Sequence, residues 1–186
     1  MLASGLKRLY QAVFQGIEFF AGNWFLGAFV RFCFAAVLLV YFWNSALTKI
    51  SAGALGFLQP SVGAYAQILP SLTETAGYDV SQIAFFPYGL IVLMGTWAEF
   101  VLPALIVAGL FTRAASLGFI GFVAVMTYVD VTGHGVDAGA VGAWFDGNPA
   151  SLIADQRLLW MVMLVYLVLK GPGQLSLDYL LGRMSR

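Results

Sequence analysis

The sequence predicts an all-α membrane protein: a transmembrane four-helix bundle with an N-terminal interfacial amphipathic helix and structured outer loops. Composition is the first reason, because 61% of the 186 residues are hydrophobic and 10% are charged, against about 45–50% and about 25% in soluble domains. The second reason is that four apolar stretches have the length of a membrane span. They lie at about 24–43, 87–110, 114–129 and 152–169. The length fits a single domain, 1–186.

Charge and ligand-forming residues exclude several classes of function. Nine cations balance nine acids, and the cations are dispersed along the chain, so no nucleic-acid partner is expected. The chain has one cysteine, Cys33, and one histidine, His134. An intrachain disulfide, a bis-histidine haem or an iron–sulfur cluster would need more ligands. No intrinsic cofactor is therefore expected, and any redox chemistry would place the electrons on a diffusible organic molecule or on a partner subunit.

The first element expected is an amphipathic helix over residues 5–21. Apolar residues recur there at helical spacing, with polar residues on the opposite face. The apolar set is Leu6, Leu9, Tyr10, Val13, Phe14, Ile17 and Phe20. Polar residues throughout place such a helix in the membrane interface rather than across it. The alternative is a solvated helix that packs against a partner.

The first span, 24–43, carries aromatic residues at both ends, where the membrane interfaces lie. Arg31 lies inside this span, and Gly27, Ala28 and Ala35 share its helical face. Because small residues mark helix–helix contacts in membranes, we expect Arg31 to point into the bundle. The connection that follows, 44–86, is long enough to have structure of its own.

The second span, 87–110, contains the carboxylate of Glu99 in an otherwise apolar segment. A lone acid at membrane depth costs several kcal/mol, so we expect Glu99 to be paired. Pro103 cannot donate the backbone hydrogen bond that would reach the Glu99 carbonyl, which adds a second polar group at the same depth.

A glycine turn, 109–113, leads directly into the compact third span, 114–129. The loop 131–154 precedes the fourth span, 152–169, and glycine and proline at 171–173 end that helix. Ser176 is expected to cap a short final helix over 177–182.

The distribution of cations predicts the orientation. One side of the predicted bundle holds Lys7, Arg8, Arg113, Lys170, Arg183 and Arg186. Only Lys49 and Arg157 fall on the other side. Because cytoplasmic loops carry an excess of lysine and arginine, both termini are predicted to be cytoplasmic.

The depths of the two buried charges predict that they meet. At 1.5 Å per residue, Arg31 lies about 10 Å and Glu99 about 16 Å from the cytoplasmic boundary. An arginine side chain can close that gap, and a buried ion pair is cheaper than either charge alone. We therefore predict a Glu99–Arg31 contact, either as a structural clamp or as a clamp that also contacts a ligand.

A second polar set lies at the outer ends of the last two spans. Asp130 ends the third span, Gln156 and Arg157 begin the fourth, and Trp160 follows one turn later as an aromatic wall. Asp130 and Arg157 are expected to pair, as an interfacial salt bridge or as part of a binding site.

A quinone suits either of the two polar sets, the one around Arg31 and Glu99 or the one around Asp130 and Arg157, because its carbonyls accept hydrogen bonds and buried carboxylates can exchange its protons. The candidate quinone ligands are Arg31, Glu99, Asp130, Gln156, Arg157 and Trp160.

The second outer loop offers a candidate metal site. Asp130, His134 and Asp137 lie in a glycine-rich segment, and their side chains could bind a divalent cation. Their spacing matches no specific metal motif, so a solvated acidic loop is the alternative.

Over about residues 27–181 the chain resembles the DoxX/DoxD family of small four-span membrane proteins. The resemblance rests on Arg31 followed by Lys49, on Glu99 followed by the 109–113 turn, on the compact third span, and on the tail from Gly171 to Asp178. It implies a multi-pass protein of the bacterial cytoplasmic (inner) membrane. Some members of this family are the membrane subunit of a thiosulfate:quinone oxidoreductase, and others accompany oxidative-stress or metal-stress systems.

Three functions follow as hypotheses. The first is a quinone-interacting membrane subunit of an oxidoreductase, with membrane lipid and a second subunit as partners. The second is a non-catalytic membrane anchor or assembly factor. The third is a metal-linked or oxidative-stress-linked membrane protein that uses the outer acidic loop.

Overall fold

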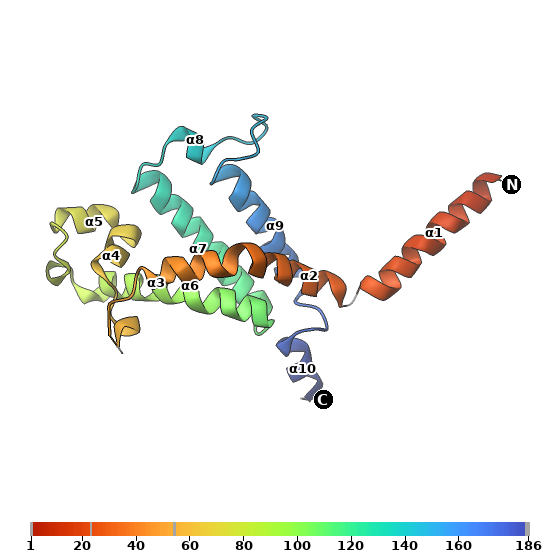
Figure 1. Cartoon of the computed structure of the whole chain (residues 1–186), viewed down its shortest axis with the longest axis horizontal. Coiled ribbons are helices and arrows are strands. Elements are labelled where there is room, and N and C mark those ends of the chain that lie inside the picture. The colour runs from red at the N-terminus through yellow and green to blue at the C-terminus, as the bar shows by residue number, and fades with distance from the viewer. Residues whose placement is uncertain (1, 23, 54, 185–186) are drawn as a thin grey trace.

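The computed structural model describes residues 2–22, 24–53 and 55–184, and these ranges form helices joined by turns and loops (Figure 1). The longer helices are α1 (Leu2–Ala21), α2 (Phe25–Phe34), α3 (Val40–Leu47), α6 (Leu90–Ala108), α7 (Thr112–Thr132), α9 (Ala154–Lys170) and α10 (Leu177–Met184). The short ones are η1 (Ala35–Leu39), η2 (Gly56–Leu58), α4 (Val62–Ile68), α5 (Pro70–Thr75), η3 (Val80–Gln82), η4 (Phe85–Gly89) and α8 (Ala138–Val141). The predicted all-α class is confirmed.

Three helical segments in the described part of the chain are long and apolar enough to cross a membrane. They are Phe25–Leu47, Phe85–Ala108 and Thr112–Thr132. The first combines α2, the π-helical turn η1 and α3, so the helix continues past the predicted end at residue 43. These segments agree with three of the four predicted stretches. The fourth predicted stretch, 152–169, corresponds to α9, which has 17 residues and is not one of these three segments.

The core lies where α2, α3, α6, α7 and α9 pack together. Phe119 is at its centre, with its ring edge-on to Phe34 at 5.3 Å and to Phe42 at 4.8 Å between centroids. Edge-to-face contacts of this kind add to the stabilisation that ring burial gives. Large apolar residues also cover the outside of these helices, among them Phe29, Val37, Met94, Leu117, Val125 and Val162. Exposed apolar residues on this scale indicate a surface that contacts lipid.

The connection between the first two apolar segments is structured, as predicted. Its helices α4 and α5 pack with the start of α6 around a small second core that includes Ala64, Tyr65, Ile83 and Val92. Desolvation in this core raises the pKa of the Tyr65 phenol.

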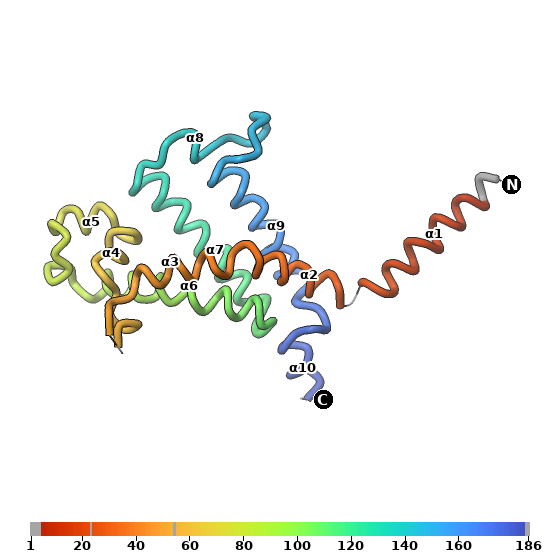
Figure 2. The backbone as a smooth tube through the Cα atoms, in the orientation of Figure 1, coloured from red at the N-terminus to blue at the C-terminus, as the bar shows by residue number. Residues whose placement is uncertain are grey.

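The two ends of the bundle are built differently. At one end, here called the α10 end, the α6–α7 turn and the segment between α9 and α10 meet the first half of α2. Helix α1 projects away from the bundle at this end and contacts α2, the helix that follows it in the chain (Figure 2). At the other end, here called the α8 end, α8 bridges the tips of α7 and α9 (Figure 1).

The final helix begins where the sequence predicted. The Ser176 hydroxyl accepts a hydrogen bond from the Tyr179 amide at 3.2 Å, which satisfies one free N–H of the first turn. The helix extends to Met184, two residues beyond the predicted end at 182.

Candidate functional site

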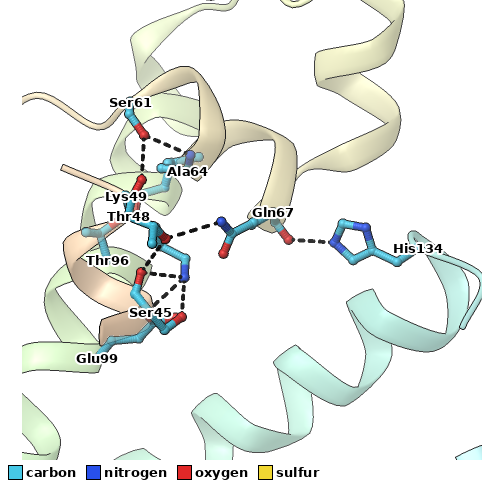
Figure 3. A network of polar contacts seen from close by, with 10 residues as sticks. Ser45, Thr48, Lys49, Ser61, Ala64, Gln67, Thr96, Glu99 and His134 are labelled. Atoms are coloured by element: carbon cyan, nitrogen blue, oxygen red, sulfur yellow. Dashed lines mark hydrogen bonds and ion pairs between the residues drawn. The ribbon is translucent and has the colours of Figure 1, made fainter. Parts of the chain in front are cut away.

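Glu99 pairs with Lys49, and the predicted contact with Arg31 is wrong. The Lys49 ammonium lies 3.0 Å from Glu99 Oε2, and the two side chains are 3% and 7% exposed. The ammonium also donates to the Ser45 hydroxyl at 2.6 Å and to the Ser45 carbonyl at 3.3 Å (Figure 3). The pair is therefore closed from solvent, and a third polar residue completes the hydrogen bonding of the cation.

The position of Lys49 explains the error. Helix α3 ends at Leu47, so Lys49 lies just beyond the helix, and its side chain folds back one turn to Ser45. The prediction compared the depths of Glu99 and Arg31 below the cytoplasmic boundary. It did not consider Lys49, which lies at the opposite end of the first span from Arg31. The four-residue spacing between Ser45 and Lys49 indicated that these two side chains would be neighbours, but no pattern in the sequence indicated that Lys49 rather than Arg31 contacts Glu99.

Arg31 binds backbone carbonyls instead of a carboxylate. Its Nε donates to the Ile106 carbonyl at 3.0 Å, and one terminal nitrogen donates to the Val107 carbonyl, both in the last turn of α6. The other terminal nitrogen donates to the Leu175 and Pro172 carbonyls. The last carbonyls of a helix have no partner within it. Arg31 thus points into the protein, as predicted, and joins the end of α6 to the segment before α10.

Asp178, in the first turn of α10, binds the turn between α6 and α7 at the same end of the bundle. Its carboxylate accepts from the amides of Phe111 at 2.7 Å and Thr112 at 2.9 Å, at the start of α7. Its own amide donates to the Gly109 carbonyl at 2.8 Å. A carboxylate at a helix N-terminus satisfies free N–H groups and interacts favourably with the helix dipole. We call Arg31 and Asp178 the α10-end latch.

The latch leaves no room for a side chain at Gly109. Its φ is +70°, and an added Cβ would lie 2.6 Å from Ser176 Cβ and 2.8 Å from Arg31 Cζ. The glycine turn noted in the sequence is therefore needed for the close approach of α6 to Arg31 as well as for its backbone conformation.

At the α8 end the predicted pair of Asp130 and Arg157 is confirmed. Arg157 donates to the Asp130 carboxylate and to the Thr127 hydroxyl, both on α7. Its side chain is 12% exposed and that of Asp130 is 26% exposed. The Arg157 Nε is buried and has no hydrogen-bond partner among the described residues. This arginine thus has donor capacity that the fold does not use.

The neighbours of Arg157 differ from those predicted. Gln156 is exposed in the first turn of α9 and is not among the residues that line the groove beside Arg157. Trp160 is buried in the core, where its ring packs against Phe42 at 5.9 Å between centroids, so it forms no wall beside the pair. Another tryptophan, Trp144 in the loop after α8, takes that place, and its indole N–H donates to the Ala154 carbonyl at 3.0 Å.

Arg157 lines a groove between α7 and α9, about 720 Å³ in volume, which we call the α7–α9 groove. Its walls are apolar apart from Arg157 and Thr127, and include Val123, Ala124, Trp144 and Leu158. A concave, mostly apolar site with a few polar groups is typical of sites that bind small molecules.

The structure does not gather the predicted metal ligands. Asp130 binds Arg157, while His134 Nε2 lies 3.0 Å from the Gln67 carbonyl (Figure 3). Asp137 accepts from the amides of Gly139 and Ala140 and so caps α8. Within the described ranges, no three of the His, Cys, Asp and Glu side chains are placed to hold a metal ion. Each predicted ligand is engaged in a different contact.

Comparison with protein-family models, with curated proteins and with solved structures finds no match.

Proposed function

We propose that this chain is a DoxX-like integral membrane protein whose α7–α9 groove binds the ring of a quinone or quinol, as the membrane subunit of a redox system. The observation that carries the proposal is that Arg157 lines an otherwise apolar groove, while its buried Nε has no hydrogen-bond partner among the described residues. A guanidinium has five N–H donors, and Arg157 directs hydrogen bonds to two side chains of α7.

The chemistry of a quinone fits these surroundings. Its flat apolar ring suits the walls formed by Trp144 and Leu158, and its carbonyl oxygens accept hydrogen bonds from Arg157. A bound quinone would supply reversible two-electron, two-proton chemistry. The partly exposed Asp130 carboxylate accepts a hydrogen bond from Arg157 and so holds the guanidinium in place at the groove.

The membrane topology is part of the same proposal. With α9 as the fourth span, about 26 Å of helix crosses the hydrocarbon core, and exposed apolar residues such as Leu159 and Val162 face lipid. The α10 end then faces the cytoplasm of a bacterial cell, with both termini on that side, and α1 lies in the interface. Five of the six cations that predict this orientation are exposed there, while Arg186 lies outside the described residues.

The experiment measures binding of a short-chain quinone to the purified protein in detergent. Arg157→Gln should raise the Kd about tenfold or more, because hydrogen bonds to charged groups contribute about 1.5–3 kcal/mol. Ala124→Trp should fill the groove and block binding. Val125→Trp is the matched control, because Val125 is the adjacent residue on α7, is exposed and does not line the groove. Equal affinity in all four proteins would exclude this site.

A second candidate is a non-catalytic anchor for a partner subunit. It is favoured by the fact that the fold engages both buried charges of the first two apolar segments, Arg31 with backbone carbonyls and Glu99 with Lys49. This function predicts co-purification of a partner in mild detergent, together with no quinone binding by the wild-type protein.

A further inference from the structure

The α10 end carries exposed positive charge that the protein itself does not neutralise. The cations there are Lys7, Arg8, Arg113, Lys170 and Arg183, and all five are exposed. None of them forms an ion pair with a carboxylate in the part of the chain that the structure describes. The acids at this end are Glu18, which is exposed, and Asp178, whose carboxylate binds the amides of α7.

Helix α1 presents an apolar face that no other helix covers within the described ranges. Its residues Leu6, Val13 and Ile17 are 71%, 51% and 53% exposed. The helix contacts the bundle through α2, and Figure 1 shows it projecting into open space. Helix α10 is also amphipathic, with exposed Leu180 and Leu181 at the same end of the bundle.

The position of α1 next to the first apolar segment places its apolar face near the membrane surface. That segment begins at Phe25 and α1 ends at Ala21, so the last turn of α1 lies close to the level where the chain enters the membrane. Lys7 and Arg8 flank the apolar stripe, and basic residues at the edges of such a stripe are typical of helices that lie on membranes containing anionic lipid.

We propose that α1 lies on the membrane surface at the α10 end and that the five cations there bind the head groups of anionic phospholipids. The apolar face enters the boundary between head groups and acyl chains, while the cations interact with the negative surface. This inference does not depend on the α7–α9 groove, because that groove lies at the opposite end of the bundle.

The test uses the full chain with Cys33→Ser, reconstituted in phosphatidylcholine alone or mixed with phosphatidylglycerol. A fluorophore is attached at Val13→Cys, on the apolar face, or at Gln15→Cys, on the polar face. With phosphatidylglycerol present, nitroxides on the lipid acyl chains should quench the Val13 label at least threefold more than the Gln15 label. High salt should reduce this difference, because it screens exposed charges.

Charge variants test the role of the cations. Combining Lys7→Gln with Arg8→Gln should shift the docked fraction of α1 by more than tenfold towards the undocked form, because each basic residue near an anionic surface contributes about fivefold. Glu18→Gln is the matched control on the same helix and should leave docking unchanged or strengthen it.

Three results would overturn the proposal. Equal quenching of the two labels would show that α1 does not lie on the membrane. A Val13 label shielded from water but not reached by acyl-chain nitroxides would show a protein contact. Docking that is the same without phosphatidylglycerol and in the Lys7 and Arg8 variants would show that head-group charge has no role.

Discussion

The two half-buried arginines of the bundle are used in opposite ways. Arg31, at the α10 end, directs its three nitrogens to backbone carbonyls of α6 and of the segment before α10. Arg157, at the α8 end, binds two side chains of α7, and its Nε is buried without a partner among the described residues. An arginine that binds the free carbonyls at a helix end belongs to the fold, whereas one that lines an apolar groove and has a donor without a partner is a candidate for ligand contact.

The Lys49–Glu99 pair, like Arg31, is a buried contact that belongs to the fold. Breaking this pair should have the largest effect on stability. Lys49→Met should destabilise the protein by about 3–5 kcal/mol, because it leaves the Glu99 charge buried without a partner. The free energy of unfolding in detergent measures this. The double variant Lys49→Met with Glu99→Leu should recover most of the loss. If the double variant is as unstable as the sum of the single variants, the two side chains do not interact.

Comparing the two arginines directly sharpens the contrast. Arg31→Gln should cost about 3 kcal/mol in unfolding free energy, because several carbonyls lose a charged donor. Arg157→Gln should cost about 1 kcal/mol, because its ion pair with Asp130 is partly exposed and such pairs contribute little, and it should act mainly on ligand affinity. Thermal unfolding of the two variants side by side measures the difference. Equal destabilisation by the two variants would show that Arg31 and Arg157 contribute equally to the fold.

The carboxylate of the α10-end latch should have an intermediate effect. Asp178→Ala removes the acceptor for two amides at the start of α7, and loss of a cap costs about 0.5–2 kcal/mol. Amide hydrogen exchange should accelerate at Phe111 and Thr112. Asp178→Asn retains an acceptor oxygen and should recover part of the protection. No change in exchange would mean that water replaces the carboxylate without cost.

The smallest effect is expected where the α8 end is held to α4. His134→Ala removes one hydrogen bond to the Gln67 carbonyl, which contributes about 0.5–1.5 kcal/mol. Exchange at the amides of α4 should report the loosening, while α9 should be unchanged. Faster exchange throughout the bundle would show that this contact stabilises more than the local packing of α4.

The long helices could be predicted from the sequence because apolar runs and their end signals are local. Ser176 at the start of α10 is such a signal, and the structure confirms it. The pair of Asp130 and Arg157 was also predictable, because both residues lie at the ends of adjacent helices that meet at the same level.

Long-range contacts could not be predicted in the same way. Asp178 caps a helix that begins 66 residues earlier in the chain, and no local pattern indicates this. Trp144 lies in a loop without periodicity, so its place at the groove follows only from the path of that loop. For Glu99 the sequence predicted Arg31 as the partner, and Lys49 takes that place because its side chain folds back from just beyond the end of α3.

The Lys49–Glu99 pair also bears on how the chain enters a bilayer. The partners are separated by 50 residues, and each alone is costly at membrane depth. The first two apolar segments would therefore be expected to leave the translocation channel as one hairpin, with Lys49 and Glu99 already neutralising each other. In the segment between them, the Ser61 amide donates a hydrogen bond to the Lys49 carbonyl at 2.8 Å. Folding of this segment would therefore help to bring Lys49 to its place beside Glu99 as the hairpin forms.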